Sequence, residues 1–253
     1  MIDKVIEKMR TITVIGGGFS GTLLLANLIN KASAPLKVIL VDKSGDFGTG
    51  LAFMTQDPSH LLNVRAFNMG AYADDPGHFY KWLQENKEIW RALDPAFSNL
   101  EICENSYIPR KIYGYYLKSI LKQTLDDAKQ KNISISLSKE EVVRASLDSE
   151  NKIDLTYASG DTFKTDYLVL AIGVESKRSI TIEGSTERCI MNMWKKEDKN
   201  ILFAPKLDYL PKTTELIMLG SGLTMIDALM TLVDKGYRGN VTIISRSGKI
   251  PHP

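Results

Sequence analysis

Cysteine and histidine are both scarce in this chain of 253 residues. The two cysteines, Cys103 and Cys189, lie far apart and form no Cys-x-x-Cys motif. Their spacing excludes a disulfide framework and a zinc ribbon, and it argues against a dithiol redox centre. His60, His78 and His252 have no spacing that would gather them around a metal ion. We therefore expect no metal site, and this cysteine usage favours the cytoplasm as the compartment.

The chain also lacks a surplus of charge and several hydrolytic motifs. Lys and Arg number 32 against 30 Asp and Glu, which gives a formal net charge of +2. Nucleic-acid binding needs a clustered basic face, so we expect no nucleic-acid partner. No GxSxG, HExxH or GxxxxGK[ST] sequence is present. Serine hydrolase, zinc protease and P-loop functions therefore have no support.

One uncharged stretch, from Thr11 to Asn30, has the length of a membrane span but not its composition. A cluster of glycines interrupts it after five residues. A strand at Thr11–Ile15, a tight turn at Gly16–Gly21 and a helix at Thr22–Asn30 fit the pattern better. We therefore predict a βαβ start and no membrane association.

The rest of the chain predicts an α/β fold with two Rossmann-like units. The first unit, residues 1–200, continues with a strand at Lys37–Val41 and a helical insert at about 76–131, whose helices lie around His78–Leu93 and Arg110–Lys129. A strand at Ile133–Leu137, a three-stranded β-meander at about 141–165 and a strand at Tyr167–Ile172 follow. The last strand is a continuous apolar run, the profile of a strand buried on both faces.

Residues 201–253 predict a partial second Rossmann-like unit. A buried strand at Glu215–Leu219, a helix at Leu223–Lys235 and a strand at Asn240–Ser245 repeat the order of the first unit. The segments TVIGGGFSGTLLLANLI and IMLGSGLTMIDALMTLV match as strand, glycine turn and helix. The chain ends one βαβ unit into this second copy, and its strand edges predict self-association through an incomplete sheet.

The first glycine motif, Gly16-x-Gly18-x-x-Gly21, has the spacing of a dinucleotide-binding fingerprint. Gly16 permits the tight turn, Gly18 lets the backbone approach a pyrophosphate, and Gly21 lets the helix pack on the strand. Asp42 ends the next strand, where a carboxylate accepts a hydrogen bond from a ribose hydroxyl. The motif predicts a dinucleotide with its pyrophosphate at the helix N-terminus.

The second motif, Gly220-x-Gly222-x-x-Met225, is weaker because methionine replaces the third glycine. We expect its helix to pack less closely on the strand. The following strand ends in Ser245-Arg246, and either residue can align with Asp42. Serine and arginine suit the 2′-phosphate of NADP, whereas an acid would suit the ribose of NAD. A surface arginine after a strand is the alternative interpretation.

Taken together, these motifs resemble the bacterial FAD/NAD(P)-binding proteins, which have two dinucleotide-binding domains and are related to flavin-dependent N-hydroxylating and Baeyer–Villiger monooxygenases. Further segments carry the resemblance: Phe47–Phe53, Asp57–Val64, Pro109–Leu117, Thr165–Gly173, Gly220–Asp227 and Ser245–Pro251. It implies that the first unit binds FAD and the second binds NADP or NAD. It also implies a turn at Ala171–Gly173 close to FAD and a loop at residues 47–69 against the flavin ring.

The candidate cofactor residues follow from the motifs and this resemblance. For FAD they are Gly16, Gly18, Phe19, Ser20, Gly21, Asp42, Lys43, Gly50, His60, Leu62, Asn63, Val143, Ala171 and Gly173. Within that set, the resemblance implies that His60, Leu62 and Asn63 lie beside the flavin ring and that main-chain groups near Val143 contact the adenine. For NAD(P) the candidates are Gly220, Gly222, Leu223, Thr224, Ser245 and Arg246.

The leading functional hypothesis is an FAD-dependent oxidoreductase that takes a hydride from NAD(P)H and acts on a small molecule. Monooxygenase-like chemistry is one form of this hypothesis. Catalytic residues and the substrate stay unassigned, because the flavin carries the redox chemistry. The alternative is a protein that binds or senses a dinucleotide without turnover, or an inactive fragment of a longer flavoenzyme. Members of the family look longer than this chain, which predicts a C-terminally shortened relative.

Overall fold

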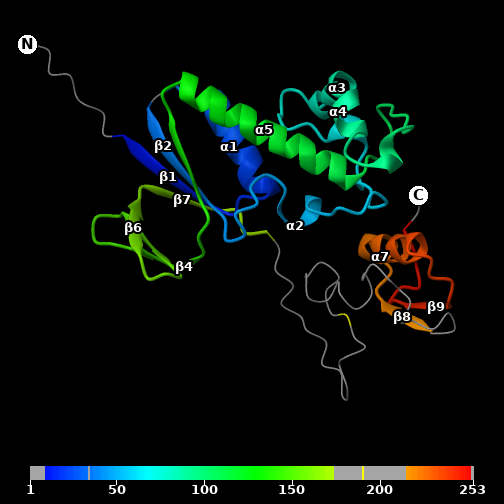
Figure 1. The fold of residues 1–253 in the computed structure, drawn as a ribbon. Helices are drawn as coiled ribbons and strands as arrows, with labels where there is room; N and C mark the ends of the chain where they lie inside the picture. The colour runs from blue at the N-terminus through cyan, green and yellow to red at the C-terminus, as the bar shows by residue number, and fades with distance from the viewer. Residues whose placement is uncertain (1–8, 34, 174–189, 191–214, 252–253) are drawn as a thin grey trace, which may run out of the picture.

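A computed structural model describes residues 9–33, 35–173, 190 and 215–251. The boundary predicted between residues 200 and 201 lies outside these residues. Within them, the chain forms a four-stranded parallel sheet, a helical insert, a β-meander and a smaller βαβ unit (Figure 1). The predicted α/β class is confirmed.

The main sheet has the strand order β3-β2-β1-β7. Its strands are β1 (Arg10–Ile15), β2 (Leu36–Val41), β3 (Ser134–Ser138) and β7 (Tyr167–Leu170). All neighbours are parallel, and Ile15 pairs with Val41 on one side and with Leu170 on the other. The carboxyl ends of β1, β2 and β7 therefore meet at one edge, which is where ligands bind in doubly wound folds.

Two long helices cover one face of this sheet, α1 (Phe19–Lys31) and α5 (Arg110–Gln130), and α5 crosses α1 in Figure 1. Both helices supply apolar residues to the core beneath them. That core contains Val14, Leu25, Ile29, Leu40 and Leu121. Apolar residues of the strands and of the two helices thus share one core, as the sequence pattern predicts for a sheet that is covered by helices.

The long helix of the helical insert is α5, and shorter elements pack against its first half to form a second, aromatic core. These elements are α2 (Gly50–Phe53), η1 (Ala66–Asn68), α3 (His78–Glu85), α4 (Lys87–Arg91) and η2 (Pro95–Phe97). The single helix predicted around His78–Leu93 is wrong, because the chain breaks at Asn86. Asn86 has a φ of −112° and a ψ of 28°, outside the helical range, and its side-chain amide donates to the Trp82 carbonyl.

The β-meander is confirmed within its predicted limits. It consists of β4 (Val142–Leu147), β5 (Ile153–Tyr157) and β6 (Thr162–Thr165), paired antiparallel in sequence order. It returns the chain to the main sheet, where the Asp166 carboxylate accepts a hydrogen bond from the Thr11 N–H at 2.7 Å. Asp166 also forms an ion pair with Lys152 of the meander.

Two strands expected to be buried are exposed. Tyr167, Leu170 and Ile172 are 52%, 63% and 69% exposed, because among the described residues β7 pairs only with β1. In the described part of the second unit, β8 (Leu216–Leu219) pairs only with β9 (Val241–Ile244), and Ile217 and Leu219 are likewise exposed. The apolar runs identified the strands correctly, but burial on both faces requires layers that the described part of the chain does not contain.

Candidate functional site

The first glycine turn lies at the carboxyl edge of the main sheet. Gly16 has a φ of +106°, a left-handed value that favours glycine, and its N–H donates to the Val41 carbonyl at 2.8 Å. A Cβ on Gly16 would lie 2.2 Å from the Ala171 carbonyl oxygen. The structure thus brings the ends of β1, β2 and β7 together, with Gly16, Asp42 and Ala171 as neighbours.

Asp42 is held rigidly beside this turn. One carboxylate oxygen accepts the Gly17 N–H at 2.8 Å, and the other accepts the N–H and the hydroxyl of Ser44 at 2.9 and 2.6 Å. An ionised carboxylate offers about four lone-pair positions. Asp42 therefore keeps acceptor capacity for a ribose hydroxyl while its orientation is fixed by its own neighbours.

Close backbone contacts explain the other two glycines of the motif. A Cβ on Gly21 would lie 1.9 Å from the Gly16 carbonyl oxygen, so only glycine lets α1 approach β1 this closely. A Cβ on Gly18 would lie 3.0 Å from the Gly50 Cα, and the Gly48 N–H donates to the Gly17 carbonyl at 2.8 Å. The segment around Gly48 and Gly50 therefore lies against the turn.

The N-terminus of α1 has the properties of an anion site. The N-cap is Gly18, it makes no side-chain capping hydrogen bond, and the first turn contains no acidic residue. Main-chain N–H groups there and the helix dipole favour a phosphate. Ser20 is exposed in this first turn, whereas the Phe19 ring packs 5.4 Å from the Phe53 ring in the insert. Phe19 can thus contribute its main chain to a ligand, but its side chain belongs to the core.

The remaining FAD candidates are spread over three environments. Lys43 forms an exposed ion pair with Glu141 at 3.2 Å, and Gly173 is exposed with a φ of +73°. The register of β4 against β5 shifts between Val142 and Arg144, which makes Val143 the extra residue of a bulge. A bulged residue stands outside the regular ladder, so this position suits a main-chain contact to an adenine.

The three predicted neighbours of the flavin ring do not share one environment. Leu62 is buried in the aromatic core, and its N–H donates to the Ile108 carbonyl. Asn63 is exposed. His60 is 4% exposed, and its two ring nitrogens lie 2.8 Å from Thr55 Oγ1 and 2.7 Å from Thr231 Oγ1. Nε2 also lies 3.2 Å from the Asp227 carbonyl oxygen. The polar atoms of His60 therefore point to protein groups, two of which belong to the second unit.

The second glycine turn repeats the geometry of the first. Gly220 has a φ of +100°, and its N–H donates to the Ile244 carbonyl at 2.8 Å. Leu219 pairs with Ile244 as Ile15 pairs with Val41. The residue after each second strand is thus Asp42 in the first unit and Ser245 in the second. This register aligns Ser245, rather than Arg246, with Asp42.

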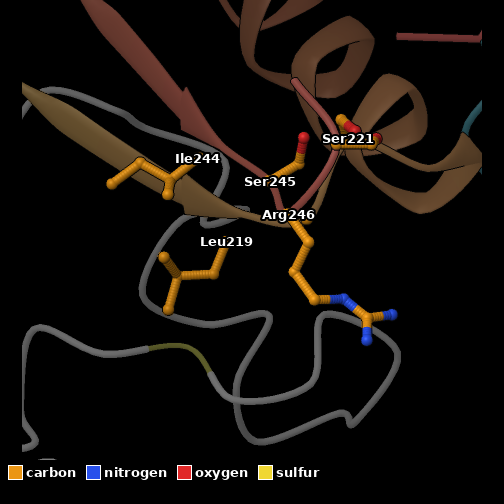
Figure 2. Close-up of a pocket in the computed structure, with 7 residues that line it drawn as sticks. Leu219, Ser221, Ile244, Ser245 and Arg246 are labelled. Carbon is orange, nitrogen blue, oxygen red and sulfur yellow. The ribbon is translucent and has the colours of Figure 1, made fainter. Parts of the chain in front are cut away.

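A pocket of about 880 Å³ opens at the carboxyl ends of β8 and β9. It is lined by Leu219, Gly220, Ser221, Ile244, Ser245, Arg246 and Ser247. Figure 2 shows the Arg246 side chain extending from the end of β9, beside Leu219 and Ile244 of the two strands. The Ser221 hydroxyl donates to the Lys249 carbonyl, which folds the segment after β9 back against the glycine turn.

Helix α7 (Leu223–Asp234) follows this turn with Gly222 as its N-cap, no side-chain cap and no acidic residue in its first turn. Leu223 and Thr224 are exposed there, so the main-chain groups of this turn are open to an anion. Met225 stands where the first motif has Gly21. Since a Cβ on Gly21 would lie 1.9 Å from a carbonyl oxygen, α7 must stand farther from its strand than α1 does.

A buried polar cluster joins α7 to the first unit, and the motif analysis did not identify it. Asp227 forms an ion pair with Arg110 at 3.0 Å, and both side chains are largely buried. The Thr231 hydroxyl lies 2.8 Å from Asp57 Oδ2 and 2.7 Å from His60 Nε2. Four of these residues lie in segments that carry the family resemblance, Asp57–Val64, Pro109–Leu117 and Gly220–Asp227, but no sequence pattern pairs them with one another.

Acidification is expected to loosen this contact. Burial lowers the pKa of His60, with Arg110 acting in the same direction and Asp57 and Asp227 against it. While α7 is in place, the buried His60 ring stays neutral. When α7 undocks from the first unit, the ring is exposed to water and binds a proton below about pH 6.5. Undocking is therefore favoured as the pH falls from that value toward the depressed pKa. Hydrogen exchange in α7 should accelerate over this window, after correction for intrinsic exchange.

The two carboxyls of the cluster act in opposite directions. Burial raises the pKa of Asp57, but hydrogen bonds from Ser59 and Thr231 outweigh it and lower that pKa, so acid also weakens the contact through Asp57. Burial raises the pKa of Asp227 despite Arg110, which has the opposite effect. A His60→Gln variant should flatten the pH dependence near neutrality. An unchanged profile in this variant would refute the assignment to His60.

The described residues contain neither a candidate metal site nor a candidate membrane span. No group of three His, Cys, Asp or Glu side chains there can hold a metal ion. None of the helices in the described ranges combines the length and the apolar character that crossing a membrane requires.

Comparison with protein families identifies one model. A family described as FAD-NAD(P)-binding matches residues 13–175, which is more than half of the chain. Uncharacterised proteins of Mycobacterium tuberculosis and Mycobacterium bovis are 22% identical over 278 residues, covering 95% of this chain and 52% of theirs. The chain thus spans about half the length of the curated relatives that it matches.

Solved structures share the fold at low identity. The cadaverine monooxygenase of the desferrioxamine biosynthetic pathway from Erwinia amylovora, bound to FAD, gives a TM-score of 0.54 at 17% identity, covering 94% of this chain and 52% of that chain. A cyclohexanone monooxygenase mutant from Rhodococcus sp. Phi1, bound to NADP+, gives 0.55 at 18% identity, covering 92% and 38%. Both likenesses confirm the predicted architecture.

Proposed function

Because the chain belongs to the FAD-NAD(P)-binding family, we propose that it is an FAD-dependent oxidoreductase that takes a hydride from NAD(P)H. One observation carries this proposal. Two glycine turns of matching conformation, with φ values of +106° at Gly16 and +100° at Gly220, each close a pair of parallel strands in the same chain. Two such turns provide for two dinucleotides, which is what transfer from a nicotinamide to a flavin needs.

The residues around the first turn fit FAD. The N–H groups at the start of α1 would bind the pyrophosphate, and Asp42 would accept a ribose hydroxyl. The bulge at Val143 would offer main-chain groups to the adenine, and Ala171 and Gly173 would pass close to the cofactor. Bound FAD would supply the acceptor for the hydride. The chain's own task is then to hold and orient both nucleotides.

The residues around the second turn fit a nicotinamide dinucleotide. The N–H groups at the start of α7 would bind its pyrophosphate, and Ser245 would occupy the position that Asp42 has in the first unit. The pocket lined by Gly220, Ser245 and Arg246 would take the adenosine ribose with its substituent. The neighbours with this fold are monooxygenases that act on small molecules, and we extend only that class of substrate to this chain.

The test of this proposal is the absorbance of bound flavin and its loss on reduction. The purified protein, reconstituted with FAD, should show flavin absorbance, and NADPH or NADH added without oxygen should bleach it. Absence of flavin binding would refute the proposal. A flavin that neither nicotinamide reduces would instead indicate a protein that binds or senses a dinucleotide without turnover.

A further inference from the structure

We infer that Asp227 and Thr231 are positioning residues, which fasten the NAD(P) unit to the FAD unit so that the two nucleotides meet in one geometry. The inference rests on the proposed function, and it concerns the polar cluster that Asp57, His60 and Arg110 form with these two residues. None of the glycine motifs contains any of the five side chains.

The two α7 residues of the cluster are buried although both are polar. Asp227 and Thr231 are 7% and 2% exposed. A buried carboxylate or hydroxyl is costly unless it is paired. The Thr231 hydroxyl has one partner in its own helix, the Asp227 carbonyl at 3.0 Å. The other partners come from the first unit, at 3.0 Å for Arg110 and at 2.8 and 2.7 Å for Asp57 and His60. The docked position of α7 therefore gives Asp227 its ion pair and Thr231 two partners outside its own helix.

Hydrogen bonds within the first unit hold the residues that contact α7. Arg110 opens α5; its N–H donates to the His60 carbonyl at 2.7 Å and its Nε to the Leu61 carbonyl at 2.8 Å. The Asp57 carboxylate accepts both the N–H and the hydroxyl of Ser59. These bonds fix the guanidinium and the carboxylate with respect to residues 57–61. The cluster therefore accepts α7 in one orientation, because its hydrogen bonds are directional.

The position of the cluster along α7 gives it a functional consequence. Asp227 lies five residues after Gly222, about 7.5 Å along the helix at 1.5 Å per residue, and Thr231 lies one turn further. The same helix presents its N-terminus to the proposed pyrophosphate site. Residues 57–61, on the other side of the cluster, belong to the loop for which the sequence predicts contact with the flavin ring. The cluster thus links one element of each nucleotide site.

The experiment uses variants that keep shape and remove one interaction. Asp227→Asn removes the charge that faces Arg110, and Thr231→Val removes the hydroxyl at the same volume. Thr231→Ser restores the hydroxyl, and Asp234→Asn removes an exposed acid from the other end of α7. The protein is loaded with FAD in each case. Hydrogen exchange across α7 and anaerobic flavin reduction by NADPH are then measured.

We expect Asp227→Asn and Thr231→Val to accelerate exchange across α7 about tenfold, the effect of losing one buried polar contact. Flavin reduction at saturating NADPH should slow by a similar factor, while the dissociation constants of NADPH and FAD change by less than about twofold. Thr231→Ser and Asp234→Asn should match the wild type. This split between rate and affinity separates positioning from loss of a nucleotide site.

Two outcomes would overturn the inference, and they differ. If the wild-type flavin is reduced and both variants are reduced at the same rate with unchanged exchange, the positioning role alone is wrong. If NADPH leaves the wild-type flavin oxidised, the proposed function fails and the positioning role fails with it. Exchange across α7 then still reports whether the cluster holds the helix.

Discussion

Replacing Gly18 with valine is expected to abolish FAD binding while leaving the second unit able to bind a nicotinamide dinucleotide. Gly18 is the N-cap of α1, at the point where a pyrophosphate would approach the main-chain N–H groups of the first turn. A branched side chain would occupy that approach. We expect the affinity for FAD to fall at least a hundredfold, which corresponds to about 2.7 kcal/mol.

The structure adds a second reason for a large effect. A Cβ at Gly18 would lie 3.0 Å from the Gly50 Cα, so even alanine must displace the segment that covers the turn. Valine adds two methyl groups to this contact. The variant therefore both blocks the phosphate and moves Gly50, another candidate FAD residue.

A reciprocal variant in the second unit provides the control. Gly222 is the N-cap of α7, and a Cβ there meets no atom within 4 Å. Gly222→Val should leave flavin absorbance intact and weaken NAD(P)H binding. Flavin titration, with thermal unfolding to verify that each variant is folded, distinguishes the two sites. Wild-type affinity for FAD in a folded Gly18→Val protein would show that the first motif does not hold the cofactor.

Local sequence signals predicted the backbone geometry of the first glycine turn. Gly16 needs a left-handed backbone and Gly21 permits a close approach, and each requirement is met within a few residues of its strand or helix. Asp42 could be placed because it ends the strand that pairs with the glycine strand. Such features depend on the period of apolar residues and on backbone conformation, both of which a sequence displays directly.

The contacts that were missed are between residues far apart in the chain. His60 meets Thr231 across 171 positions, and neither residue belongs to a periodic pattern that indicates the other. Arg110 and Asp227 are similarly remote. The helix break at Asn86 was missed for the opposite reason, since one residue with φ −112° and ψ 28° interrupts an otherwise helical pattern. The positions of the cofactor residues around bound nucleotides stay predictions.

The second unit is expected to prefer NADPH over NADH, and Arg246→Ala is expected to remove the preference. The register of β8 and β9 places Ser245 where Asp42 stands in the first unit, so no carboxylate at that position repels a 2′-phosphate. Arg246 follows directly and extends from the end of β9 at the edge of the pocket (Figure 2). Arginine at this point suits a phosphate through charge-assisted, bidentate hydrogen bonds.

The size of the preference follows from that contact. A charge-assisted hydrogen bond contributes roughly 1.5–3 kcal/mol, which is about one to two decades in affinity. The matched control is Arg238→Ala, because Arg238 precedes β9 and its guanidinium donates to the Val233 and Tyr237 carbonyls, at the other end of the strand. Titration of both reduced nucleotides into the FAD-loaded protein gives the ratio directly. Equal affinities in the wild type, or a ratio that Arg246→Ala leaves intact, would show that Arg246 is a surface arginine with no part in recognition.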